Sequence, residues 1–130
     1  MTRILVTGLA TLDLIFALEH LPQLGEKYLA IEGLLSGGGN AGNAAVATAR
    51  LGGTVSIFAA IGQDDVGDLI LKGFQKEGID TRSVFQSMGH QSSFSSVVID
   101  KSGERQIINC RSALSRENLQ ILQNLTEVNF

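Results

Sequence analysis

The chain has 130 residues and a mass of 13.8 kDa, which is the size of one domain. Hydrophobic residues make up 44% and charged residues 18%, so the composition excludes a disordered chain and allows a hydrophobic core. The formal net charge of -3 excludes a basic nucleic-acid surface, and the single cysteine, Cys110, excludes an internal disulfide and a cysteine-ligated zinc site.

The amino terminus resembles a signal peptide only loosely, because Asp13 interrupts the apolar stretch that follows Arg3. No apolar run in the sequence is long enough to span a bilayer. We therefore expect a soluble, cytoplasmic protein that binds neither a membrane nor nucleic acid.

The first part of the chain predicts two kinds of strand and a helix. Residues 4–8 form a short apolar run that predicts a buried strand, and residues 9–16 continue it. Residues 27–35 alternate imperfectly between apolar and polar, as in a half-exposed strand. The alanine-rich residues 40–51 predict a helix, which Gly52 ends.

The middle of the chain continues the alternation of strands and helices. Residues 54–61 predict a second buried strand, and residues 65–77 predict an amphipathic helix with Asp64 as its N-cap. Residues 84–86 predict a short strand. This order predicts an α/β domain with a parallel sheet and crossover helices.

The last part of the chain has a different pattern. Residues 94–100 and 105–110 flank a short turn and predict a β-hairpin, with Gly103 in the left-handed position of the turn. Together with residues 27–35, the hairpin is expected to form a small separate sheet beside the main one. Residues 115–125 predict a final helix.

The glycine-rich segment 37–43 is the first candidate for a binding site. Glycines where a helix begins let a ligand approach the backbone and its free N–H groups. Asn40 and Asn43 are three residues apart, so both amides are expected on the same side of the first helical turn. An amide both donates and accepts hydrogen bonds, which suits vicinal hydroxyls. The alternative is a glycine-rich turn whose asparagines only cap the helix.

The same segment also matches the dinucleotide-binding pattern G-x-G-x-x-G. Gly37, Gly39 and Gly42 supply the three glycines, and Asp64 lies 22 residues beyond Gly42. A single match of this kind is a weak signal. The fingerprint should follow a buried parallel strand, whereas the strand expected before Gly37 is half-exposed. A dinucleotide-binding fragment of an oxidoreductase therefore remains an alternative.

Two charged residues outside this segment are also candidates. Asp13 follows the first predicted strand, where a carboxylate either binds a ligand or forms a local Asx-turn. Arg105 begins a strand of the hairpin, and a solvated charge at a sheet edge is the simpler interpretation of it. His20 and His90 have no partners at metal-ligand spacing, so no metal site is expected from the histidines.

Taken together, several motifs resemble the ribokinase/PfkB family of carbohydrate kinases. They occur in the family's order over nearly the whole chain, and the form G-G-N-A-x-N is closest to the ketohexokinase-like branch. The matching residues are Gly8, Asp13, the segment 38–43, Ala49-Arg50-Leu51-Gly52, the segment 61–67 and Gly103-Glu104-Arg105.

The resemblance implies a ribokinase-like three-layer α/β/α core, which is Rossmann-like, with a small β-sheet lid formed by residues 27–36 and 92–110. In such a kinase, Asp13, Asn40 and Asn43 would hydrogen-bond sugar hydroxyls. Gly38 and Gly39 would let the backbone close on the sugar, and Arg105 would reach into the site from the lid. The resemblance also implies a homodimer through the lid sheet.

The length of the chain departs from the family, whose members are more than twice as long. Their second half carries the catalytic aspartate, the magnesium-associated residues and most of the ATP pocket, and no G-A-G-D-like segment occurs here. The resemblance therefore implies that residues 1–130 are the N-terminal sugar-binding part of an ATP- and Mg²⁺-dependent sugar kinase, inactive alone. The alternatives are the oxidoreductase fragment and a non-catalytic interaction module.

Overall fold

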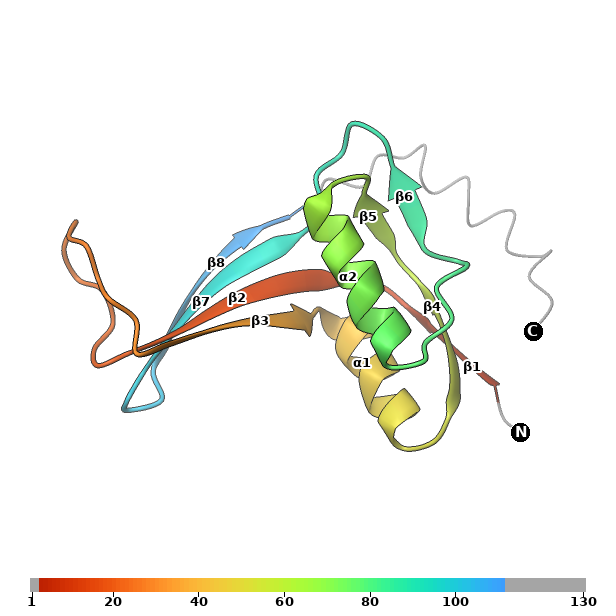
Figure 1. Ribbon diagram of the computed structural model, residues 1–130, viewed down its shortest axis with the longest axis horizontal. Helices are drawn as coiled ribbons and strands as arrows, with labels where there is room; N and C mark the ends of the chain where they lie inside the picture. The colour runs from red at the N-terminus through yellow and green to blue at the C-terminus, as the bar shows by residue number, and fades with distance from the viewer. Residues whose placement is uncertain (1–2, 112–130) are drawn as a thin grey trace.

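The computed structural model describes residues 3–111. They form two parallel pairs of strands, together called the parallel sheet, with two helices, and a four-stranded sheet that projects away from them (Figure 1). The helix predicted at residues 115–125 lies outside the described residues. Among the described residues, no helix is both long and apolar enough to cross a membrane.

The parallel part confirms the predicted α/β order. Its strands pair β1 with β4 and β5 with β6, and every pair is parallel. A helix precedes β4 and another connects β5 to β6, as crossover connections require. The elements are β1 (Arg3–Thr7), α1 (Asn40–Arg50), β4 (Thr54–Phe58), β5 (Ala60–Gly62), α2 (Asp65–Lys76) and β6 (Phe85–Ser87).

Local signals in the sequence account for the helix ends. Asp64 is the N-cap of α2, and its carboxylate accepts a hydrogen bond of 2.8 Å from the backbone amide of Gly67. Gly52 follows α1 and Gly78 follows α2, with φ angles of 84° and 71°. Glycine adopts such left-handed angles without a steric cost, so both helices end where the sequence predicts.

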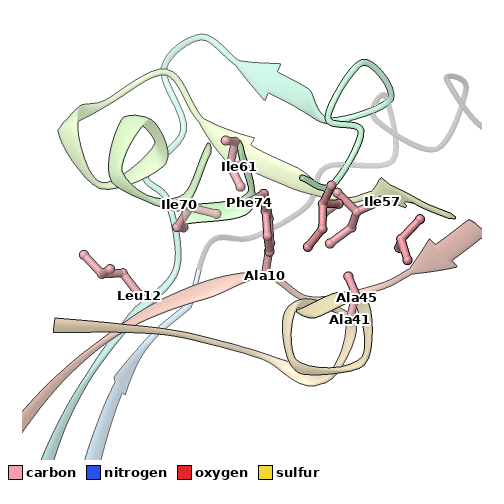
Figure 2. Close-up of a cluster of buried hydrophobic side chains, with 11 residues drawn as sticks. Ala10, Leu12, Ala41, Ala45, Ile57, Ile61, Ile70 and Phe74 are labelled. Carbon is pink, nitrogen blue, oxygen red and sulfur yellow. The ribbon is translucent and has the colours of Figure 1, made fainter. Parts of the chain in front are cut away.

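The hydrophobic core lies between the parallel sheet and the two helices. Ile57 of β4 and Ala45 of α1 are fully buried in one cluster with Phe74 of α2 (Figure 2). Both helices share this cluster, so they cover the same face of the sheet. The three-layer core implied by the family resemblance needs helices on the opposite face as well. That arrangement remains a prediction for a longer chain.

The first strand is more exposed than predicted. Residues 4–8 were expected to be a buried strand, but Ile4 of β1 is 39% exposed. Within residues 3–111, β1 pairs only with β4, and the helices cover one face of this sheet. Its apolar composition fits a strand that is buried on both faces.

The second sheet has four strands in the order β3-β2-β7-β8. β2 pairs antiparallel with β3 and parallel with β7, and β7 forms the predicted hairpin with β8. Gly103 has a φ of 86° in the turn, as expected. The strands are β2 (Thr11–Leu18), β3 (Glu32–Gly38), β7 (Phe94–Asp100) and β8 (Arg105–Cys110).

Two boundaries differ from the sequence prediction. Residues 9–16 do not continue the first strand, because the chain leaves the parallel sheet at Gly8, whose φ is 139°, and enters the centre of the other sheet. The strand expected over residues 27–35 begins only at Glu32 and extends through the glycines to Gly38. The glycine-rich segment is therefore partly a strand, and it pairs with the start of β2.

Candidate functional site

A row of polar side chains crosses the four-stranded sheet. Asp13 of β2 lies opposite Ser36 of β3 and Ser95 of β7, and Ser95 lies opposite Asn109 of β8. Neighbouring residues in register point to the same face of a sheet. The polar row therefore consists of Ser36, Asp13, Ser95 and Asn109.

Three members of the polar row line a pocket. Asp13, Ser95 and Asn109 border a hollow of about 210 Å³ that also includes Gly39, at the start of α1, and Arg111, just after β8. The pocket thus lies where the four-stranded sheet meets the N-terminal end of α1. It brings together a carboxylate, a hydroxyl, an amide and a guanidinium group.

Asp13 is placed as a ligand-binding carboxylate would be. It is half-buried within β2, near the start of the strand, which excludes the local Asx-turn considered from the sequence. Within residues 3–111, its carboxylate has no hydrogen-bond or ion-pair partner. A carboxylate that faces a pocket without a partner is available to accept hydrogen bonds from a ligand.

The two glycines before α1 make room for other atoms of the chain. A Cβ at Gly38 would collide with the Asp13 carboxylate and would lie 3.1 Å from the methyl group of Thr11. Gly39 has a φ of 83°, and a Cβ there would collide with the Leu9 carbonyl. Gly38 therefore lets the Asp13 side chain lie across β3, and Gly39 lets the helix start against the Leu9 backbone.

The backbone donors at the start of α1 are partly used. The sequence predicts free N–H groups there, but the amides of Ala41 and Gly42 donate to the carbonyl of Leu9, at 3.1 and 3.3 Å. The close contact between Gly39 and Leu9 brings this carbonyl to the helix start. A ligand therefore does not find the full set of donors that an isolated helix would offer.

The two asparagines differ in their positions. Neither side chain makes a hydrogen bond among the described residues, and the N-cap, Gly39, has no side-chain cap, so the simple capping role is not observed. Asn43 lines a second hollow, of about 530 Å³, between α1 and α2, and Thr11 borders both hollows. Asn40 is exposed and lines neither hollow. Sugar binding by Asn40 and Asn43 remains a prediction.

Arg105 lies farther from Asp13 than the resemblance implies. It pairs with Ile99, which pairs with Ala17, four residues along β2 from Asp13. At about 3.3 Å per residue, the row of paired residues that contains Arg105 lies about 13 Å from the polar row that contains Asp13. Arg111 lines the pocket instead. The assignment of Arg105 to the site therefore remains a prediction without support from the geometry.

Asp64, the acidic residue of the dinucleotide interpretation, has an internal role. Its carboxylate accepts hydrogen bonds from the hydroxyl of Ser92 at 2.6 Å, the amide of Ser92 at 2.8 Å and the amide of Gly67. Burial raises the pKa of Asp64, but these bonds outweigh burial and hold the pKa below its ordinary value. The dinucleotide interpretation requires this carboxylate to bind a ribose. Its hydrogen bonds instead join α2 to the segment before β7.

Sequence reasoning missed most residues of the pocket, among them Ser95, Asn109 and Arg111. The adjacent serines at the start of β7, Ser95 and Ser96, are the signal that could have indicated Ser95, because neighbouring residues of a strand face opposite sides of the sheet. The position of Asn109 and Arg111 depends on the register of β8 against β7. That register follows from the length of the hairpin turn.

The family model described as "pfkB family carbohydrate kinase" matches residues 1–130. The chain belongs to the pfkB family of carbohydrate kinases. Among curated relatives, the ribokinase of Bacillus subtilis is 29% identical over 113 residues, which are 87% of this chain and 38% of the relative. The ribokinase of Haemophilus influenzae is 29% identical over 79% of this chain and 34% of its own length.

Solved structures support the same assignment. A protein of Agrobacterium tumefaciens matches with a TM-score of 0.81 and 32% identity, over 91% of this chain and 41% of that one. Ribokinase from Cryptococcus neoformans, solved in complex with ADP, matches with a TM-score of 0.67 and 27% identity over 87% and 35%. Fructokinase from Xylella fastidiosa matches with a TM-score of 0.67 and 31% identity over 84% and 32%.

The pfkB chain therefore spans between about a third and two fifths of the length of these relatives. The named relatives are ribokinases and a fructokinase, and they give no support to the narrower ketohexokinase-like branch.

Proposed function

We propose that this chain is the sugar-binding part of an ATP-dependent carbohydrate kinase, which transfers the γ-phosphate of ATP to a sugar hydroxyl. The observation that carries the proposal is the carboxylate of Asp13, which has no partner within residues 3–111 and lies in a pocket with Ser95 and Asn109. A carboxylate accepts hydrogen bonds from two hydroxyl groups, and the neighbouring hydroxyl and amide groups both donate and accept. This combination suits a polyhydroxy ligand.

The nucleotide and metal parts of the reaction belong to the proposal for the longer protein. ATP supplies the phosphoryl group, and Mg²⁺ neutralises the charge that develops on it. Among residues 3–111, no group of three His, Cys, Asp or Glu side chains is arranged to hold a metal ion. No magnesium site is therefore proposed on the described residues. The contribution proposed for them is to bind and orient the sugar.

A phosphoryl-transfer assay on the protein at its natural length tests this function. ADP release is measured with MgATP and a panel that includes D-ribose and D-fructose. We expect sugar-dependent ADP release that saturates with one sugar of the panel. ADP release that no sugar stimulates would contradict the proposal.

The same preparation separates the kinase from its two rivals. Binding of NADH, followed by its fluorescence, together with no response to sugars would favour the oxidoreductase fragment. A lack of response to every sugar and nucleotide would favour the interaction module. The hydrogen bonds of Asp64 to Ser92 argue against the oxidoreductase fragment, because they occupy the carboxylate that would bind the dinucleotide.

The homodimer implied by the resemblance remains a prediction, and one observation favours it. Leu34 and Ile107, next to the polar row on the same face of the four-stranded sheet, are 57% and 45% exposed. A second copy placed on this face would cover them. Sedimentation should show a dimer that Leu34→Glu converts to a monomer. A monomeric wild-type protein would contradict this prediction.

A further inference from the structure

Asn109 is held in one orientation by its neighbour in the polar row. The Ser95 hydroxyl donates a hydrogen bond of 2.8 Å to Asn109 Oδ1. Ser95 is only 7% exposed, whereas Asn109 is exposed and borders the pocket. The buried member of the pair thus fixes the amide of the exposed member.

This hydrogen bond leaves the donor end of the amide available. With Oδ1 occupied by Ser95, the Nδ2 group of Asn109 still carries two N–H donors. Neither donor has an acceptor among residues 3–111. The pocket therefore presents a pure acceptor at Asp13 and an oriented donor at Asn109.

The two groups stand on strands that are separated by β7. At about 4.8 Å between neighbouring strands, the backbones of Asp13 and Asn109 are about 10 Å apart. A sugar in the pocket would therefore meet the two side chains with different substituents. Whatever oxygen faces Asn109 must accept a hydrogen bond.

We propose that Asn109 is a specificity-determining residue, which donates a hydrogen bond to a sugar oxygen that Asp13 does not hold, and that Ser95 is its positioning residue. The inference rests on the proposed function. A sugar without this oxygen would leave the Asn109 donors unpaired where the bound sugar covers them. Sites that hydrogen-bond a substrate hydroxyl reject analogues that lack it much more strongly than apolar pockets reject a change in size.

The test uses the protein at its natural length and the sugar that it phosphorylates fastest. We compare kcat/KM for that sugar with kcat/KM for each of its monodeoxy analogues. In Asn109→Ala, we expect kcat/KM for the parent sugar to fall about tenfold or more. The ratio of parent to analogue should approach one for a single deoxy position and stay unchanged for the others.

Two further variants separate positioning from a general structural effect. Asn109→Asp keeps the size of the side chain but replaces its donors with acceptors, so it should lose the same discrimination. Ser95→Ala should weaken discrimination at the same deoxy position, and it should have no further effect on that ratio when Asn109 is already alanine. The matched control is Ser96→Ala, on the opposite face of β7, which should leave every ratio unchanged.

Each outcome bears on the proposal. Asn109→Ala that lowers kcat/KM equally for the parent and all analogues, or that changes nothing, would overturn the inference while the kinase function stands. An effect of Ser95→Ala that persists when Asn109 is alanine would overturn the positioning role. A wild-type protein that phosphorylates no sugar would overturn the proposed function, and this inference with it.

Discussion

At the scale of single residues, the contact between Gly38 and Asp13 decides how the carboxylate reaches the pocket. The absence of a side chain at Gly38 gives the Asp13 carboxylate the space that it occupies across β3. The sequence predicts both residues as site residues, but it does not show that they touch. That contact depends on the pairing of β2 with β3, in which Thr11 lies opposite Gly38.

Gly38→Ala should displace the Asp13 side chain, because the new methyl group would occupy the position of the carboxylate. We expect sugar affinity to fall at least tenfold and the free energy of unfolding to fall by about 1–3 kcal/mol. Titration calorimetry and urea unfolding measure the two effects. Gly37→Ala is the matched control, since nothing lies within 4 Å of a Cβ there. Equal behaviour of the two variants would refute the role of Gly38.

At the scale of elements, Asp64 joins the start of α2 to the segment that leads into β7. One carboxylate caps the helix and accepts two hydrogen bonds from Ser92, which lies 28 residues farther along the chain. The cap itself could be predicted from the sequence, because an N-cap is a local signal. The bonds to Ser92 could not, because they depend on how two distant segments fold together.

Asp64→Ala should lower the free energy of unfolding by about 1–3 kcal/mol, through the lost cap and the unpaired Ser92 groups. Chemical unfolding followed by circular dichroism measures this loss. The neighbouring Asp65→Ala serves as the control and should cost about 0.5 kcal/mol or less. A loss that is no larger for Asp64 than for Asp65 would contradict the assigned contacts.

The contribution of Asp64 should also depend on pH. Its pKa is lower in the folded protein than the ordinary value of 3.8, so the unfolded chain binds the proton more tightly. The stabilisation is therefore complete above about pH 5 and is lost as the pH falls below the ordinary value. The stability difference between wild type and Asp64→Asn should shrink from pH 7 to pH 3. A difference that grows on acidification would show the opposite sign of the pKa shift.

The boundaries of elements show what local sequence can predict. The ends of α2 and the hairpin of β7 and β8 were predicted well, because Asp64, Gly78 and Gly103 mark them locally. The place of β2 was predicted wrongly. Its apolar pattern does not distinguish between the two sheets, and its partner β7 lies about 80 residues away along the chain.

At the scale of the whole molecule, the register of β8 against β7 decides which arginine side chain lies at the pocket. Arg105 and Arg111 stand near opposite ends of β8, and the pairing with β7 brings the end near Arg111 to the pocket. The sequence indicates Arg105 through a family motif, but only the assembled sheet shows Arg111. Most of the fold was therefore predictable, whereas the composition of the pocket was only partly so.

A comparison of the two arginines tests this consequence of the register. Arg111→Ala should raise KM for the sugar several-fold more than Arg105→Ala, because only Arg111 lines the pocket. Steady-state kinetics of the protein at its natural length measure both values. A larger effect of Arg105→Ala would instead support the role that the family resemblance implies.

Sugar binding by Asp13 is the feature of the molecule on which the proposed function depends most. Calorimetric titration tests this binding most directly. The sugar that the protein phosphorylates is titrated into the wild-type protein and into Asp13→Asn, because this substitution keeps the shape of the side chain and removes its charged acceptor. We expect the affinity to fall at least tenfold, while the unfolding transition stays within a few degrees of the wild type. Unchanged affinity in a folded Asp13→Asn protein would contradict sugar binding by Asp13.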